Sequence, residues 1–144
     1  MAAGNFTLYD NAKLLLLNGG LNMSSATITA VLLGAGYTPS AAHDTWSDAS
    51  AQEIADSGYA EQAVSGQTVT LASGTVTVDS GDISFGTNVT LTAKYLALVL
   101  GTAGSLAGTD KLIGYCDLNT GGGTVSSTAG AFSVNTPNGL FTAA

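Results

Sequence analysis

The hydrophobic and polar positions from Asn88 to Leu100 form the most regular pattern in the chain. Over its first half, apolar and polar side chains alternate, as in a strand with one buried and one solvated face. From Leu96 to Leu100 every side chain is apolar, which predicts burial on both faces. The opening Asn-Val-Thr-Leu-Thr is a poor helix former because Val and Thr branch at Cβ. We therefore expect this stretch to be the central strand of a sheet.

A second stretch, Ala26 to Leu33, repeats this pattern in a shorter form and is predicted to lie beside the central strand. The Gly-Ala-Gly sequence at 34–36 ends it. A loop rich in small polar residues follows over 37–51. At the end of this loop, Ser50 and Glu53 have the spacing of a capping box, which predicts a single helical turn.

A short helix is predicted at residues 8–18. Four apolar side chains recur there at helical spacing: Leu8, Ala12, Leu15 and Leu16. Thr7 and Asp10 have capping-box spacing, and Gly19-Gly20 supplies the stop. We expect this helix to cover one face of the sheet. Residues 1–7 would then form an N-terminal arm.

Gly-bearing turns divide the middle of the chain into short strands. The predicted strands are Gly58–Val64, Thr68–Ala72, Thr75–Asp79 and Asp82–Phe85. The second and third form a hairpin with one Thr face, because Thr alternates with apolar residues in both. This edge has no charge, so we expect it to be a surface on which another chain can pair.

Three further strands are predicted near the C-terminus, at Lys111–Leu118, Ala131–Asn135 and Leu140–Thr142. Simple alternation in the first of these places Ile113 and Tyr115 opposite Leu112 and Cys116. The number of short strands predicts a mainly β fold over residues 1–144. We expect one domain, an antiparallel β-sandwich or jelly-roll-like fold with a short N-terminal helix.

Charged residues make up 9% of the chain, against about 25% in an ordinary soluble domain. The chain has three Lys, no Arg and ten acidic residues, with a net charge of -7. Phosphate binding needs clustered basic side chains, so nucleic acid is excluded as a partner. A hydroxyl-rich exterior suits a subunit that lies against neighbours, because hydroxyls cost less to desolvate than ions. A monomer with a Thr-rich β surface is the alternative.

The single cysteine excludes an internal disulfide. Cys116 is predicted to be a small buried residue rather than a nucleophile, because no cation or helix start adjoins it. The apolar run from Leu14 to Leu17 is too short for a signal peptide or a membrane span. We therefore expect production in the cytoplasm, no membrane partner and no cofactor.

Two pairs of residues are weak candidates for chemistry. His43-Asp44 is the only His-acid neighbour pair, but no G-x-S-x-G motif accompanies it. A solvated loop histidine is the favoured interpretation, and no enzymatic activity is predicted. Asp79 and Asp82 resemble half of an oxygen-ligand calcium site, but the further acids of such a site are missing, and a turn stabilised by its own Asp side chains is the favoured interpretation.

Aromatic residues are the best candidates for binding. Trp46, Tyr37 and Tyr59 lie on one long polar segment and would suit an interface anchor or a sugar-stacking platform. The alternative is that these rings fold the loop back onto the core. Phe6 is a further candidate, as an anchor on the N-terminal arm.

The order of these features resembles a family of small virion proteins of tailed bacteriophages. The matching features are the Leu-rich segment Lys13–Gly20, the strand Ile28–Leu33, Tyr37-Thr-Pro, Asp44-Thr-Trp46, Glu53, Ser57-Gly-Tyr59, Lys94-Tyr95, Leu112-Ile-Gly-Tyr-Cys-Asp-Leu118 and Phe132-x-Val-Asn-x-Pro-x-Gly-Leu140. Together they cover most of the chain.

This resemblance implies a structural role in the virion. Within that role we expect a capsid decoration (cement) protein that binds the major capsid protein at the outer surface of the head. Such a subunit would be a homo-oligomer, with a trimer as one form. The alternatives are a tail fibre or baseplate component, or a carbohydrate-binding module that uses Trp46 and the tyrosines.

Overall fold

Strand β8 (Tyr95–Leu100) lies in the middle of a five-stranded antiparallel sheet of order β1-β9-β8-β2-β3. The structure is a computed structural model that describes residues 4–136 and 139–143. The other strands of this sheet are β1 (Thr7–Leu8), β2 (Ile28–Leu33), β3 (Gln62–Ala63) and β9 (Lys111–Asp117). All six residues of β2 are buried and pair with β8. The predicted central strand is confirmed over Tyr95–Leu100, and its predicted neighbour over Ile28–Leu33. The prediction that the central strand begins at Asn88 is wrong, because Thr92–Ala93 pairs with Val125–Ser126 in a separate sheet.

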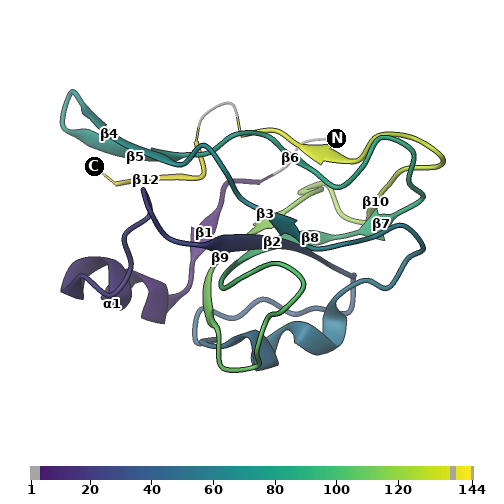
Figure 1. The fold of residues 1–144 in the computed structure, drawn as a ribbon, viewed down its shortest axis with the longest axis horizontal. Coiled ribbons are helices and arrows are strands. Elements are labelled where there is room, and N and C mark those ends of the chain that lie inside the picture. The colour runs from purple at the N-terminus through teal and green to yellow at the C-terminus, as the bar shows by residue number, and fades with distance from the viewer. Residues whose placement is uncertain (1–3, 137–138, 144) are drawn as a thin grey trace.

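A second layer of small antiparallel sheets packs on one face of the five-stranded sheet (Figure 1). It contains β4 (Thr68–Ala72), β5 (Thr75–Asp79) and β12 (Phe141–Ala143), then β6 (Ile83–Ser84) with β11 (Ser133–Val134), and β7 (Thr92–Ala93) with β10 (Val125–Ser126). The larger hydrophobic core lies between the layers, where Leu96 and Leu98 of β8 meet Ile83, Phe85 and Phe132. The mainly β, antiparallel, sandwich-like fold is therefore confirmed.

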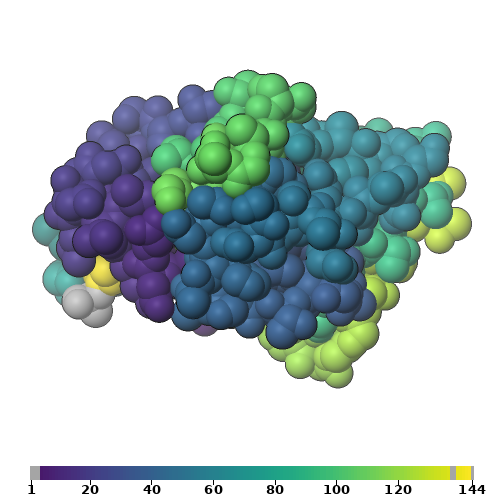
Figure 2. All heavy atoms as spheres, turned by 90° about the horizontal axis from the view of Figure 1, so that it is seen from below, coloured from purple at the N-terminus to yellow at the C-terminus, as the bar shows by residue number. Residues whose placement is uncertain are grey.

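A loop layer, rather than a sheet, covers the opposite face. Two 3-10 helices, η1 (Trp46–Asp48) and η2 (Ser50–Gln52), belong to this layer. Figure 2 shows the surrounding segment spread across this face of the molecule. A second core cluster lies beneath it, where Trp46 and Ala49 pack with Ala97 and Val99 of β8. The wholly apolar half of the central strand is thus buried on both faces, as predicted.

Helix α1 (Asp10–Asn18) is shorter than predicted at its N-terminal end. Thr7 and Leu8 form β1, so the proposed capping box at Thr7 is wrong. Tyr9 is the N-cap residue and makes no side-chain capping bond. Tertiary pairing of β1 with β9 outweighs the local capping preference. The predicted stop is confirmed, because Gly19 is in the left-handed region with φ 81°.

The described part of the N-terminal segment is not a free arm. The backbone N–H of Gly4 donates to the carbonyl of Asp117, and Thr7 pairs with Tyr115 of β9. Phe6 packs against the larger core of its own chain. The predicted arm at residues 1–7 is therefore wrong for residues 4–7, and residues 1–3 lie outside the described part.

A β-bulge changes the two faces of β9. Leu98 pairs with Gly114 and Val99 with Leu112, so Ile113 is an extra residue. Beyond it the alternation shifts by one position. Tyr115 shares the smaller core with Leu112, whereas Ile113 lies in the larger one. The prediction that Tyr115 faces away from Leu112 is wrong for this reason.

Candidate interaction surface

The structure places Trp46 and Tyr37 in the core and not on the surface. Trp46 is 5% exposed and Tyr37 is 3% exposed. The backbone fixes this loop: the N–H of Trp46 donates to the carbonyl of Asp110 at 2.7 Å. A surface binding role for these two rings is therefore a wrong prediction. The alternative interpretation, in which the rings fold the loop onto the core, is confirmed.

The segment that carries Trp46 is held by Asp48. One carboxylate oxygen of Asp48 accepts the backbone N–H groups of Asp44 at 2.8 Å and Thr45 at 3.0 Å. These two hydrogen bonds lower the pKa of Asp48 below its ordinary value. The capping arrangement thus occurs at Thr45 and Asp48. The prediction of a capping box at Ser50 and Glu53 is wrong, because Glu53 bonds elsewhere, although the predicted turn is present as η2.

A chain of hydrogen bonds runs through the buried tyrosines. The hydroxyls of Tyr9 and Tyr37 are 2.6 Å apart, and the Tyr37 hydroxyl is 2.9 Å from Nδ1 of His43. Burial raises the pKa of both tyrosines, so both hydroxyls stay protonated at neutral pH. His43 is therefore half-buried and bonded to a buried tyrosine, so the prediction of a solvated loop histidine is correct for its place in a loop but not for its ring.

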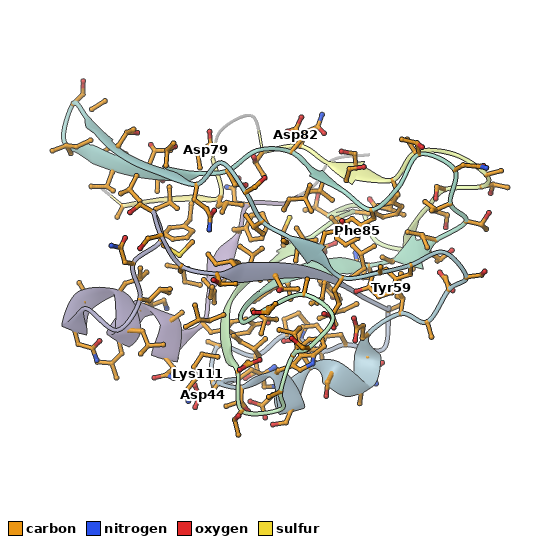
Figure 3. The ribbon with its side chains drawn as sticks, viewed as in Figure 1. Asp44, Tyr59, Asp79, Asp82, Phe85 and Lys111 are labelled. Carbon is orange, nitrogen blue, oxygen red and sulfur yellow. The ribbon has the colours of Figure 1, made fainter. Side chains whose placement is uncertain are left out.

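Asp44, the neighbour of His43, bonds away from it. Its carboxylate accepts from Lys111 Nζ at 2.7 Å and also from the side-chain amide of Asn11. Figure 3 shows Asp44 and Lys111 side by side below the sheet. In the described part of the chain the His43 ring bonds to the Tyr37 hydroxyl, and not to a serine or cysteine that could act as a nucleophile. The His-Asp neighbour pair thus binds two separate partners and forms no relay.

Tyr59 is half-buried and bridges two elements. The backbone N–H of Leu32 donates to its hydroxyl at 3.1 Å, and that hydroxyl donates to Glu53 at 2.8 Å. Its ring stacks on Phe85, with ring centroids 6.1 Å apart (Figure 3). Burial raises the pKa of Tyr59 and that of Glu53. Tyr59 therefore ties the loop to β2 and is not an open binding platform.

Asp79 and Asp82 use their carboxylates within the protein. Asp79 accepts from the backbone N–H of Ser80 at 2.8 Å and from the Thr136 hydroxyl at 3.3 Å, and Asp82 accepts from the Thr136 N–H at 3.4 Å. Across residues 4–136 and 139–143, no group of three or more His, Cys, Asp or Glu could hold a metal ion. The turn interpretation therefore describes this site, which Figure 3 shows in the upper layer.

Cys116 is buried within β9. Its thiol donates to the carbonyl of Gly4 at 3.0 Å. Burial raises the pKa of this thiol to about 11, so the reactive thiolate is scarce at neutral pH. The predicted structural role for Cys116 is supported by this environment.

Each of the three lysines is paired with an aspartate. The pairs are Lys13 with Asp10 at 2.8 Å, Lys94 with Asp117 at 2.7 Å and Lys111 with Asp44 at 2.7 Å. Ten acidic residues less these three leave seven without a lysine partner, which accounts for the net charge of -7. Four of the seven lie between residues 48 and 61. More than half of the uncompensated charge therefore lies in one segment of the chain, and within the β4–β5 hairpin only Asp79, at the end of β5, belongs to this group.

Helix α1 and the β4–β5 hairpin lie at the same end of the molecule (Figure 1), and both expose large apolar side chains. Leu14 and Leu17 of α1 are 57% and 89% exposed, and Val69 and Leu71 of β4 are 46% and 72% exposed. We call these four residues, with the groove between the two elements, the apolar surface. Exposed apolar patches of this kind mark sites of interaction with other molecules.

The groove has a volume of about 680 Å³. Leu16 and Gly19 form its wall on the helix side, and Val69, Val76 and Phe141 form its wall on the strand side. Every residue that lines it is uncharged. It is therefore suited to an apolar or hydroxyl-bearing occupant and not to an ion.

Strand β4 forms one side of the apolar surface and is an unprotected sheet edge. The order of its sheet is β12-β5-β4, and all five residues of β4 are exposed. The strand contains no charge, proline or bulge, which are the usual protections of an edge. The predicted hairpin and its two strand boundaries are confirmed, and so is its uncharged edge.

Sequence reasoning did not identify the exposed leucines of α1. The signal was present, because four consecutive leucines at 14–17 cannot all face one side of a helix. Leu15 and Leu16 pack on the core, which leaves Leu14 and Leu17 outside.

Among the residues that the structure describes, no helix is both long enough and apolar enough to cross a membrane. Comparison of the chain with protein-family models, with curated proteins and with solved structures finds no match.

Proposed function

We propose that this chain is a non-enzymatic structural protein of a bacteriophage virion, and specifically a capsid decoration (cement) protein that binds the major capsid protein at the outer surface of the head. The apolar surface carries this proposal. It exposes large hydrophobic side chains, and Leu17 is the most exposed of them. The chain has few charged residues, which are what usually keep such a surface soluble. A surface of this kind is stabilised when another molecule covers it.

The distribution of charge supports an oriented attachment. Four of the seven acidic residues without a lysine partner lie in the segment 48–61, whereas no residue that lines the groove is charged. A subunit attached through its apolar surface would keep these carboxylates in water, so attachment would carry no cost of desolvating them. The acidic segment would then point away from the shell.

Copy number supports the same role. Each contact through a surface of this size would be weak, because a few exposed side chains bury little area. Many linked copies on a shell convert weak contacts into stable attachment through high effective concentration. Such a subunit needs no catalytic centre, which agrees with a histidine and a cysteine that are both engaged in structural contacts.

The structure bears differently on the two alternatives, a tail component and a carbohydrate-binding module. A tail fibre or baseplate component would use the same apolar surface, and its position on the particle distinguishes it from a decoration protein. A carbohydrate-binding role would require exposed rings at Trp46 and Tyr37, but both rings are buried. The module is therefore not favoured.

Binding to assembled shells tests the proposal. Shells of the major capsid protein encoded in the same genome would be sedimented with the purified chain, with Leu17→Lys and with a control variant, Thr87→Lys. Both positions are exposed, and both changes add one positive charge. We expect the wild type and Thr87→Lys to co-sediment and Leu17→Lys to bind at least about tenfold more weakly, the effect of about 1.4 kcal/mol. Equal retention of all three, or of none, would overturn the proposal.

A further inference from the structure

The open edge of β4 has the pattern of a strand that pairs with a copy of itself. Its five residues, Thr68 to Ala72, read Thr-Val-Thr-Leu-Ala, with Thr70 at the centre. Val69 and Leu71 share one face of the hairpin with Val78 and Val76, their partners on β5. Thr68, Thr70 and Ala72 form the other face.

The turn determines which backbone groups of β4 are free. Ala72 pairs with Thr75 across a two-residue turn, Ser73-Gly74, whose φ angles are both positive, at 50° and 80°. Residues that flank such a turn form a hydrogen-bonded pair, and these pairs then alternate along the ladder. The N–H and C=O groups of Val69 and Leu71 therefore point away from β5, toward the open edge.

We propose that β4 pairs antiparallel with β4 of a second copy of this chain, about a two-fold axis at Thr70. Val69 of one copy then faces Leu71 of the other, and the two exchange backbone hydrogen bonds in both directions. The two Thr70 side chains lie opposite each other on the other face. This register pairs all five residues and keeps the apolar face of each hairpin on the same side of a continuous sheet.

Charge favours a second copy over a foreign chain. Each copy has a net charge of -7, so two copies repel each other over most of their surfaces. The repulsion is smallest where neither surface carries an ionic group, and β4 is such a place. A basic partner, by contrast, would find no carboxylate on this strand to bind.

The pairing is expected to be weak in dilute solution. One pair of five-residue strands buries less than the roughly 1,200 Å² of a stable specific interface. We therefore expect dimers to form at micromolar concentrations or above. The inference does not depend on the proposed function, because it concerns the purified chain alone.

Cysteine cross-linking tests the register directly. In the proposed dimer the two Thr70 Cα atoms are about 4.5 Å apart, within the range of a disulfide. The matched control is Thr68→Cys, because Thr68 faces Ala72 of the other copy and lies about 13 Å from its own equivalent. The native Cys116 is buried, and the wild-type chain measures the background of covalent dimer that Cys116 forms. Under mild oxidation we expect Thr70→Cys to give a covalent dimer as the main product and Thr68→Cys to stay at background.

Sedimentation equilibrium tests the association without a new disulfide. Leu71→Lys places a charge on the edge and removes both Val–Leu contacts of the symmetric pair, so we expect dimerisation to weaken about tenfold or more. Thr87→Lys adds the same charge elsewhere and should leave dimerisation unchanged. Because Leu71 is exposed, both variants should show the thermal unfolding of the wild type.

Three results would overturn the inference. The first is a wild type that stays monomeric up to about 1 mM, a concentration at which even weak association is detected. The second is equal cross-linking at positions 68 and 70. The third is a trimer whose assembly does not change in Leu71→Lys. Cross-linking at Thr70→Cys in a wild-type background that does not bind shells would retain this inference and overturn the proposed function. Weakened shell binding of Leu17→Lys without cross-linking at Thr70→Cys would retain only the proposed function.

Discussion

At the scale of single residues, tyrosine hydroxyls connect elements that are distant in sequence. Tyr9 bonds Tyr37, which is 28 positions away, and Tyr59 bonds Leu32, which is 27 positions away. A ring with an apolar body and a polar tip suits either a core or a surface. The sequence singled out Tyr37, Tyr59 and Trp46 as candidate binding residues. Whether each ring is buried depends on side chains that are distant in sequence, and no local pattern reveals these partners.

Removal of the Tyr59 hydroxyl should destabilise the fold. Tyr59→Phe leaves the N–H of Leu32 without its acceptor and Glu53 without its donor. We expect the free energy of unfolding to fall by about 1–3 kcal/mol, measured by chemical denaturation. Tyr95→Phe is the control, because the described residues give its hydroxyl no hydrogen bond, and it should change stability little. Equal effects of the two substitutions would contradict this account of Tyr59.

The pKa of Glu53 links stability to pH. Burial raises this pKa, the hydrogen bond from Tyr59 opposes the rise, and the charge of Glu61 adds to it. A raised pKa in the folded state means that the ionised form is disfavoured there. The contribution of Glu53 to stability is then full below the unfolded pKa of about 4.3 and is lost as pH rises through the folded pKa.

Glu53→Gln should therefore stabilise the protein at neutral pH. Glutamine keeps an oxygen that accepts the Tyr59 hydroxyl but carries no charge to desolvate. We expect a small rise in Tm over the wild type at pH 7 that disappears near pH 3.5, where Glu53 is protonated. Thermal melts of both proteins across this range measure the difference. A rise of the same size at both pH values would show that charge is not the cause.

At the scale of elements, the sequence predicted best where turn chemistry acts locally. The boundaries of β4 and β5 are as predicted, because Ser73-Gly74 allows only a two-residue connection. The start of α1 was misplaced, because Thr7 and Leu8 gain more from pairing with β9 than from helix capping. The bulge at Ile113 has no local signal, since it arises from the register between β8 and β9.

The turn between β4 and β5 offers a stabilising substitution. Ser73 has a φ of 50°, a left-handed conformation that asparagine tolerates better than serine. Ser73→Asn should raise the free energy of unfolding by about 0.5 kcal/mol, since Asn-Gly is the preferred pair for this turn. Ser73→Val is the contrasting variant and should destabilise the hairpin, because a β-branched side chain is strained at positive φ. Denaturant titrations that rank the two variants in the opposite order would contradict the turn assignment.

At the scale of the whole molecule, the amount of charge was readable from the sequence but its arrangement was not. Composition gave the net charge of -7. Tertiary packing determines that all three lysines are bound to aspartates, and that α1 and β4 expose large apolar side chains. The candidate interaction surface could therefore be predicted only in part, through the uncharged edge of β4.

Salt should strengthen the association of copies. Added ions screen the repulsion between two chains that each carry a charge of -7, and they do not weaken an uncharged interface. Sedimentation equilibrium of the wild type at about 0.05 M and 0.5 M NaCl should give a lower dissociation constant at the higher concentration. A higher dissociation constant at 0.5 M would mean that ion pairs hold the copies together.

Imaging of intact particles tests the central claim most directly. Electron cryo-microscopy would compare particles that contain the chain with particles from which its gene has been deleted. We predict that the difference density lies on the outer surface of the head, in many symmetric copies, with the end that carries Leu17 toward the shell and the acidic segment 48–61 toward solvent. Difference density confined to the tail, or identical particles, would contradict the claim.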